Sequence, residues 1–276
     1  MNDNSEVTPR RALVTGASAG IGAAFAARLA RDGYNLVLVA RRRAQLEAVA
    51  ARLRTENGAT VEVLDADLAQ EAGMRAVEAY ITGGDPLDLL VNNAGFAVYG
   101  PIAESDPAVM TEMIQLNVIA LTRLTHAALP AMLARNSGAI INVSSGLSFG
   151  LAPTRGAYSG TKAYVNNFTR ILHMEVAERG VRVQLLVPGI TRTDFHTRSG
   201  TDLARVPATA IMEPEALVDA SLIGLERGEI VCIPGLTDPD LLVQFEAAQS
   251  AVGQNLIRNG QQPAARYGLA ATGATD

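Results

Sequence analysis

Short apolar runs alternate with longer segments of helical period along most of the chain. RALVT, NLVLVA and TVEVLDADL have the length and β-branched content of buried strands. The segments between them, such as GIGAAFAARLARDG and RAQLEAVAARLRTENG, repeat apolar residues every three or four positions. The pattern continues through LDLLVNN, GAIINVSS, VRVQLLVPG and IVCI, which gives seven strands. It predicts an α/β protein with a doubly wound, seven-stranded parallel sheet and helices on both faces.

The predicted helices and strands form a single domain, with further segments before and after it. Long helices are predicted from about Ser105 to Ala134, from about Arg155 to Arg179, and after Pro214. Glycines follow helical stretches where a left-handed cap is expected, at Gly33, Gly58 and Gly180. The predicted divisions are a flexible N-terminus (1–10), the domain (11–237) with a polar lid (about 194–212), a C-terminal helical extension (238–267) and a disordered tail (268–276).

The C-terminal extension has a helical stripe of apolar side chains that can pack on its own core or on another subunit. The stripe consists of Leu241, Leu242, Phe245, Ala248 and Val252.

Composition narrows the class of protein. The formal net charge is −5, and the arginines are scattered along the chain rather than gathered, so neither nucleic acid nor an anionic membrane is an expected partner. The single cysteine, Cys232, lies in an apolar run and is expected to be a core residue. The N-terminus has no apolar signal segment, and a cytoplasmic location is expected.

A glycine-rich loop, TGASAGIG, follows the first predicted strand and opens the first predicted helix. In that context Gly16 can make a sharp turn, Gly20 can let the backbone approach a pyrophosphate, and Gly22 can permit close packing. A plain turn between strand and helix would also use glycines. Its position predicts a dinucleotide site in a Rossmann-like fold.

The second predicted strand ends at arginines rather than at the acid that binds a ribose 2′-hydroxyl in many dinucleotide sites. Arg41, Arg42 and Arg43 follow LVLVA directly. A forked, charge-assisted contact of Arg41 and Arg42 with a 2′-phosphate favours NADP(H), with NAD(H) possible. Solvated arginines at a helix start are the alternative, although cations are poorly placed there.

Tyr158 and Lys162 lie one helical turn apart on one face, and Lys162 is the single lysine among 23 basic residues. A neighbouring ammonium is expected to lower the pKa of a tyrosine, which can then donate a proton to a carbonyl. A compact ammonium can also bind a ribose, which explains a lysine in an arginine-rich chain.

Five short motifs occur in a fixed order along the chain. They are Thr15-Gly16 with Gly20 and Gly22; Asn92-Asn93-Ala94-Gly95; Ser145 thirteen residues before Tyr158; Tyr158 with Lys162; and Pro188-Gly189 followed by Thr193. Together they resemble the short-chain dehydrogenase/reductase family, from about Arg11 to Pro234. The resemblance implies an NADP(H)-preferring carbonyl reductase or alcohol dehydrogenase, commonly a homodimer or homotetramer.

The resemblance also implies a catalytic tetrad. Tyr158 would donate and accept the proton, Ser145 would hydrogen-bond the substrate oxygen, Lys162 would bind the nicotinamide ribose, and Asn117 would hold a relay water. Ser144 is the rival to Ser145, and the family spacing favours Ser145. The implied cofactor-binding residues are Gly16, Ser18, Gly20, Ile21, Gly22, Arg41, Arg42, Asp67, Leu68, Asn93, Ala94, Gly95, Tyr158, Lys162, Pro188, Gly189, Ile190 and Thr193. Asp67 can instead be a turn residue, and Asn93 can instead bond the backbone.

The predicted substrate pocket is mainly apolar, as suits a medium-sized ketone, aldehyde or secondary alcohol. Its predicted lining is Phe96, Val98, Tyr99, Leu147, Phe149 and Leu151. Arginines around the lid could instead meet an anionic group or be solvated; they are Arg192, Arg198 and Arg205. The histidines have no metal-ligand spacing, so no metal is assigned.

Two other functions remain open. A 3-ketoacyl-carrier-protein-type reductase would want a basic docking patch, which the net acidity disfavours. A non-catalytic dinucleotide-sensing protein would lack part of the tetrad, and all four positions are filled. Hydride transfer between NADP(H) and a carbonyl or secondary alcohol is therefore the leading hypothesis.

Overall fold

Seven parallel strands form the central sheet, as the apolar pattern predicts. The computed structural model describes residues 10–259 and 263–268. Its strands are β1 Arg11–Thr15, β2 Asn35–Ala40, β3 Val61–Asp65, β4 Leu89–Asn92, β5 Gly138–Val143, β6 Val181–Leu186 and β9 Val231–Cys232. Their order is β3-β2-β1-β4-β5-β6-β9. The order reverses between β1 and β4, so the fold is a Rossmann-like, doubly wound sheet with its switch point there.

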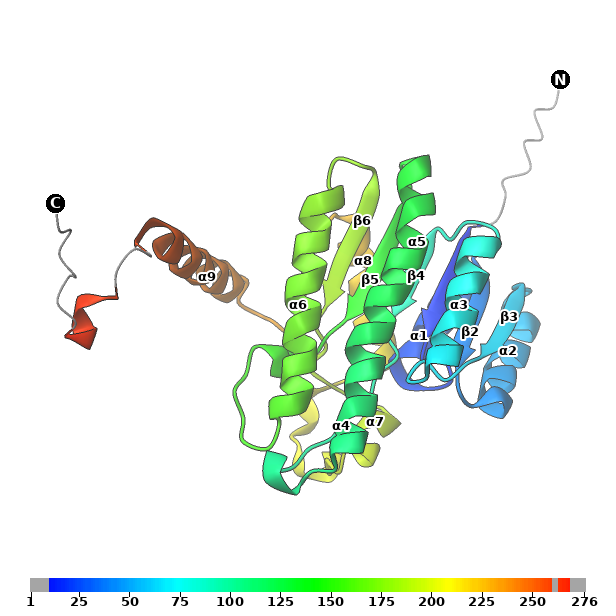
Figure 1. The fold of residues 1–276 in the computed structure, drawn as a ribbon. Helices are drawn as coiled ribbons and strands as arrows, with labels where there is room; N and C mark the ends of the chain where they lie inside the picture. The colour runs from blue at the N-terminus through cyan, green and yellow to red at the C-terminus, as the bar shows by residue number, and fades with distance from the viewer. Residues whose placement is uncertain (1–9, 260–262, 269–276) are drawn as a thin grey trace. The chain divides into compact units, whose positions relative to one another are not determined.

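Helices cover both faces of this sheet, because each carries one apolar stripe toward the strands. The helices α1 Gly20–Arg31, α2 Arg43–Asn57 and α8 Pro214–Glu226 pack on one face, and α3 Glu71–Gly83, α5 Leu121–Arg135 and α6 Gly156–Val176 lie in front of the other (Figure 1). Leu46 and Leu53 of α2 are fully buried, as are Leu124 and Met132 of α5. Burial of a side chain of this size contributes about 1.5–3 kcal/mol.

The helix predicted from about Ser105 to Ala134 consists of three consecutive segments. α4, Pro107–Ile114, has Asp106 as its N-cap, and the Asp106 carboxylate accepts a hydrogen bond from the amide of Ala108. A π-helical turn, Gln115–Ala120, then leads into α5. Such turns occur often at functional sites. The stretch Pro107–Arg135 is long and apolar enough to cross a membrane, but its apolar side chains in α5 are those that cover the sheet.

The predicted glycine caps are confirmed. Gly33, Gly58 and Gly180 have φ angles of 79°, 63° and 66°. A β-carbon at Gly180 would lie 2.1 Å from the carbonyl oxygen of Asn136, so this turn admits only glycine.

The polar segment 194–212 folds as an excursion closed at its base by a small parallel pair, β7 Ile190–Thr191 with β8 Ile211–Met212. It contains α7 Asp194–Arg198 and the 3₁₀ turns Leu203–Arg205 and Ala208–Ala210. Further 3₁₀ turns are Ile102–Glu104 and Gly146–Ser148. α4 and α7 lie at the same end of the sheet (Figure 1).

A second unit of the chain begins at Leu236. It contains α9, Asp240–Asn259, and the 3₁₀ turn Ala265–Tyr267. Leu241, Phe245 and Val252 of the predicted apolar stripe are exposed on α9. The predictions for residues 1–9 and 269–276 fall outside the described residues.

Candidate active site

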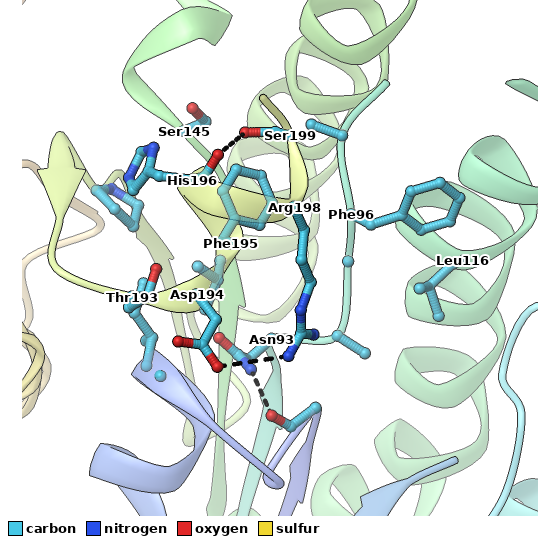
Figure 2. Close-up of a pocket in the computed structure, with 18 of the residues that line it drawn as sticks. Asn93, Phe96, Leu116, Ser145, Thr193, Asp194, Phe195, His196, Arg198 and Ser199 are labelled. Atoms are coloured by element: carbon cyan, nitrogen blue, oxygen red, sulfur yellow. Dashed lines mark hydrogen bonds and ion pairs between the residues drawn. The ribbon is translucent and has the colours of Figure 1, made fainter. Parts of the chain in front are cut away.

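A cavity of about 740 Å³ lies at the carboxyl ends of the central strands, where the strand order reverses. The turns after β1, β2, β4 and β5 line it together with α7. Figure 2 shows Ser145 and His196 toward one end of this pocket and Asp194 and Asn93 toward the other. The loops that converge here come from segments far apart in the sequence, so the sheet topology assembles the site.

The glycine loop has the geometry that its sequence predicts. Gly16 and Gly20 have φ angles of 67° and 55°, which favour glycine. A β-carbon at Gly22 would lie 2.3 Å from the Gly16 carbonyl oxygen, so Gly22 lets α1 pack against the turn. Gly22 does not line the cavity, whereas Gly16 and Gly20 do.

The amino end of α1 is suited to an anion. Ala19 at the N-cap has no side chain that can accept a hydrogen bond, and the first turn carries no acid. The backbone N–H groups of this turn are therefore left to a ligand at the edge of the cavity. A dinucleotide pyrophosphate fits this end of the helix.

The three arginines after β2 have different environments. Arg42 is half-buried, lines the cavity and donates a hydrogen bond to the hydroxyl of Ser18 at 3.1 Å. Arg41 is exposed and pairs with Glu112 at 3.6 Å, while Arg43 pairs with Asp65 at 3.2 Å and does not line the cavity. Burial and the nearby guanidiniums of Arg198 and Arg41 lower the pKa of Arg42. An incoming phosphate would relieve this repulsion.

Tyr158 lies in the other half of the cavity and is 3 % exposed. Its ring meets the edge of Tyr99 at a centroid distance of 5.8 Å and that of Phe195 at 5.9 Å. Burial raises the pKa of the phenol, although a hydrogen bond from Ser145 acts in the opposite direction. The phenol is therefore protonated at neutral pH, as a proton donor must be.

The predicted lowering of this pKa by Lys162 is wrong for the structure as it stands. The Lys162 ammonium donates a hydrogen bond to the Val143 carbonyl at 2.8 Å, and its nitrogen lies 5.9 Å from the Tyr158 ring centre. Burial lowers the pKa of Lys162 itself, from its usual 10.5 to about 8. Desolvation thus outweighs the attraction that the spacing suggested.

The two adjacent serines after β5 are distinguished by direction. Ser144 also lines the cavity, but its hydroxyl donates to Asn166 of α6 at 2.5 Å. Ser145 caps the following 3₁₀ turn, where its hydroxyl accepts from the amide of Leu147 at 3.3 Å and reaches the phenol of Tyr158. The geometry favours Ser145 over Ser144 as the group beside a substrate oxygen.

Asn117 is buried in the π-helical turn and does not line the cavity. Its amide oxygen accepts from the backbone N–H of Phe96 at 3.1 Å, and its amide nitrogen donates to the Phe96 carbonyl at 3.0 Å and to Thr161 at 3.1 Å. These bonds tie the turn after β4 to α6. The side chain of Asn117 therefore positions neighbouring groups, while its predicted relay water stays a prediction.

Two predicted cofactor residues also serve the local fold. The Asp67 carboxylate accepts from the amide of Ala69 at 3.0 Å, as a turn residue does, and the Asn93 side chain donates to the Thr15 carbonyl at 2.9 Å. Both line the cavity. The remaining predicted cofactor residues that line it are Ser18, Ile21, Leu68, Ala94, Gly95, Pro188, Gly189, Ile190 and Thr193.

Comparison with known proteins agrees with this geometry. The family model described as short chain dehydrogenase matches residues 10–204. The chain belongs to that family. It is therefore an oxidoreductase of the NAD(P)-dependent kind.

Several relatives are similar over most of the chain. A short-chain dehydrogenase from Sphingobium yanoikuyae in complex with NADPH is 38% identical, with a TM-score of 0.89, over 94% of this chain and 100% of that one. The bulky-bulky ketone specific alcohol dehydrogenase from Comamonas testosteroni is 33% identical, with a TM-score of 0.85, over 94% and 98%. A very-long-chain 3-oxoacyl-CoA reductase-like protein of Arabidopsis thaliana is 34% identical, over 80% of this chain and 74% of its own length.

The substrate end of this dehydrogenase differs in part from the prediction. Phe96, Tyr99 and Leu147 line the cavity as predicted. Val98, Phe149 and Leu151 do not. Val98 packs beside the cluster of Ala97, Met113 and Tyr158, and Leu151 is 101 % exposed on the loop before α6. These residues lie in irregular backbone, where sequence position does not fix the direction of a side chain.

Several lining residues were not predicted from the sequence, and they include Leu116, Glu112 and Arg155. Phe195 and His196 line the cavity from the segment that was predicted as a lid. Arg155 is the N-cap of α6, three residues before Tyr158. Its closeness to Tyr158 along the chain is the signal that could have identified it.

The lid arginines each have a carboxylate neighbour. Arg192 pairs with Glu213 at 2.7 Å, Arg198 with Asp194 at 3.5 Å, and Arg205 with Asp202 at 3.5 Å. Figure 2 shows Arg198 extending toward Asp194 and Asn93. Of the three, Arg198 alone lines the cavity.

Among residues 10–259 and 263–268, no group of three or more histidine, cysteine, aspartate or glutamate residues could hold a metal ion. His196 lines the cavity, and burial lowers its pKa while the Thr191 carbonyl accepts from its ring.

The buried ammonium of Lys162 costs stability, and its removal should show that cost. Between pH 8 and 10.5 the unfolded chain binds more protons at this residue than the folded one, so stability rises with pH there and is lowest below pH 8. Lys162→Met should therefore raise the free energy of unfolding by about 1–3 kcal/mol at neutral pH, part of the gain being offset at the Val143 carbonyl.

Urea unfolding of the wild type and of Lys162→Met at neutral and alkaline pH measures the difference in their free energies of unfolding. This difference should shrink toward pH 10.5. Glu175→Gln at an exposed position of the same helix is the control, and it should leave the free energy of unfolding nearly unchanged at both pH values. A Lys162→Met protein less stable than the wild type at neutral pH would contradict the assignment.

Proposed function

We propose that this dehydrogenase reduces the carbonyl of a medium-sized, mainly apolar ketone or aldehyde with NADPH, and oxidises the corresponding secondary alcohol in the reverse direction. The observation that carries this proposal is the buried Tyr158 phenol with Ser145 beside it. It lies in the same cavity as an uncapped helix end and Arg42, which has no carboxylate partner in the part of the chain that the structure describes. A proton donor and a phosphate-binding end in one cavity suit this chemistry.

The residues present divide the work of the reaction. When bound, the cofactor supplies the hydride from nicotinamide C4 to the carbonyl carbon. Ser145 donates a hydrogen bond to the substrate oxygen and Tyr158 transfers its proton there, so that the alcohol forms. Lys162, whose Nζ lies near the turn after β4, would hold the ribose. Phe195 and Tyr99 exclude water from the phenol.

The cofactor is NADP(H). The support is the half-buried guanidinium of Arg42 beside Ser18, in the place where many relatives of the fold carry an acid. The similar enzyme from Sphingobium yanoikuyae is described in complex with NADPH. Arg41 is the weaker contributor, because Glu112 already neutralises it.

A ketone is supported by the apolar residues Phe96, Leu147 and Phe195 around Tyr158. The similar alcohol dehydrogenase from Comamonas testosteroni is described as specific for bulky-bulky ketones. A 3-oxoacyl thioester is the second candidate, since a similar plant protein is named 3-oxoacyl-CoA reductase-like. Its carrier would need a cationic docking surface at the cavity mouth, where the lid arginines are paired with acids.

Replacing the phenol tests the proton transfer. Tyr158→Phe should lower kcat for ketone reduction by about 100- to 10,000-fold while leaving the Kd of NADPH within about threefold. A panel of ketones and aldehydes, followed by nicotinamide absorbance, measures turnover, and cofactor fluorescence measures binding.

Tyr164→Phe on the exposed side of the same helix is the matched control, with near-normal rates expected. Near-normal turnover by Tyr158→Phe would overturn the assignment of the proton donor.

Cofactor preference tests the arginines. Arg42→Ala should raise KM for NADPH by about 10- to 100-fold and leave KM for NADH nearly unchanged, because a charge-assisted contact with the 2′-phosphate is lost. Arg41→Ala should have a smaller effect. Arg43→Ala, which removes a guanidinium outside the cavity, is the control. Equal effects of Arg42→Ala on both cofactors would remove the argument for phosphate recognition.

We also propose that the protein is a homo-oligomer. Tyr164, Ile171 and Met174 are exposed at helical spacing on α6, and the Tyr164 hydroxyl bonds Thr122 of α5 at 3.0 Å. An apolar stripe of this kind suits packing against a second copy.

Met174→Glu should then lower the mass measured by light scattering, because a carboxylate would be buried between subunits. Glu175→Gln at the neighbouring position is the control. A wild-type monomer, or an unchanged mass for Met174→Glu, would contradict this surface as the interface.

A further inference from the structure

Two arginines that line the cavity have no carboxylate within ion-pair distance among residues 10–259 and 263–268. They are Arg42 and Arg155. The other cavity arginines are paired, Arg41 with Glu112 and Arg198 with Asp194. Arg42 lies in the half of the cavity assigned to the cofactor, whereas Arg155 lies in the half that contains Tyr158.

Arg155 is held close to the reacting end. Its guanidinium carbon lies 3.4 Å from the ring centre of Tyr99, and the Tyr99 ring in turn meets Tyr158 at 5.8 Å. The Tyr99 hydroxyl is hydrogen-bonded by Ser199 just after α7. The Tyr99 ring therefore separates the Arg155 guanidinium from the Tyr158 phenol. Arg155 packs on this ring, and Ser199 hydrogen-bonds its hydroxyl.

The backbone before Arg155 is also constrained. Thr154 has a φ of 66°, an unusual conformation for a β-branched residue, and its carbonyl accepts from the amide of Gly100 at 2.9 Å. Arg155 itself lies at the N-cap of α6, where a cation meets the positive end of the helix. A half-buried cation in this position is unfavourable unless an anion approaches it.

We propose that Arg155 binds a carboxylate of the substrate, so that the preferred substrate is an oxo acid reduced to a hydroxy acid. The planar guanidinium, stacked on Tyr99, presents its edge for a forked pair of hydrogen bonds with a carboxylate. A short apolar spacer between ketone and carboxylate matches the single ring between Tyr158 and Arg155. The phosphates of a carrier thioester lie beyond a long pantetheine arm, so a carboxylate fits better. The inference rests on the ketone reduction proposed above.

The experiment compares aryl oxo acids of increasing chain length with their methyl esters, using NADPH and the wild type, Arg155→Gln and Arg155→Lys. The wild type should prefer one acid over its ester in kcat/KM by about 10- to 100-fold. Arg155→Gln should lose this preference through KM for the acid while kcat/KM for the ester stays within about threefold. Arg155→Lys should keep part of the preference, because the charge remains and the fork is lost.

Arg205→Gln, outside the cavity, is the matched control and should leave the ratio unchanged. An equal fall for acid and ester in Arg155→Gln, or a wild type that turns over esters as well as acids, overturns the inference and leaves ketone reduction standing. If Arg155→Gln lost activity only toward a 3-oxoacyl-CoA substrate, the anion bound by Arg155 would be a phosphate of the carrier. That result would overturn the proposed carboxylate contact. A wild type that reduces neither acids nor esters nor neutral ketones would overturn the proposed function itself.

Discussion

The site depends on a hydrogen-bonded clamp between the ends of β1 and β4. The Thr15 hydroxyl accepts from the amides of Asn93 and Ala94 at 2.9 and 3.0 Å and donates to the Val91 carbonyl at 3.2 Å. The side-chain amide of Asn93 in turn donates a hydrogen bond to the Thr15 carbonyl. The clamp closes the switch point of the sheet and fixes where the glycine turn and the turn after β4 face each other. Because the Thr15 hydroxyl is buried, water does not compete for its hydrogen bonds.

From the clamp, contacts run directly to α6, the helix that carries Tyr158 and Lys162. A β-carbon at Gly95 would lie 2.9 Å from the Asn117 amide oxygen and 3.6 Å from the Lys162 ammonium, so Gly95 lets both approach. Asn117 then bonds Thr161, one residue before Lys162. The π-helical turn supplies the extra residue that brings the Asn117 side chain to the turn after β4. The Lys162 ammonium is held among these contacts, and its burial costs stability.

The sheet could be predicted from the sequence because its strands are short apolar runs and its turns require glycine at Gly16 and Gly20. The position of Ser145 beside Tyr158 could be predicted from the thirteen-residue spacing that the family resemblance implies. The sign of the change in the pKa of Tyr158 could not, because it depends on how much water Tyr99 and Phe195 remove. The directions of Val98 and Leu151 could not be predicted either, since irregular backbone has no period that assigns a side chain to a face.

The lid joins the two ends of the cavity through its own side chains. Near its start, Thr193 lies against Gly20 of the glycine loop, where a β-carbon would lie 3.0 Å from the threonine methyl. Phe195 contacts the Tyr158 ring, and Ser199 holds the Tyr99 hydroxyl. Because both aromatic rings keep water from the phenol, the raised pKa of Tyr158 depends on the position of α7. Residues 193–199 therefore connect the glycine loop to the surroundings of the Tyr158 phenol.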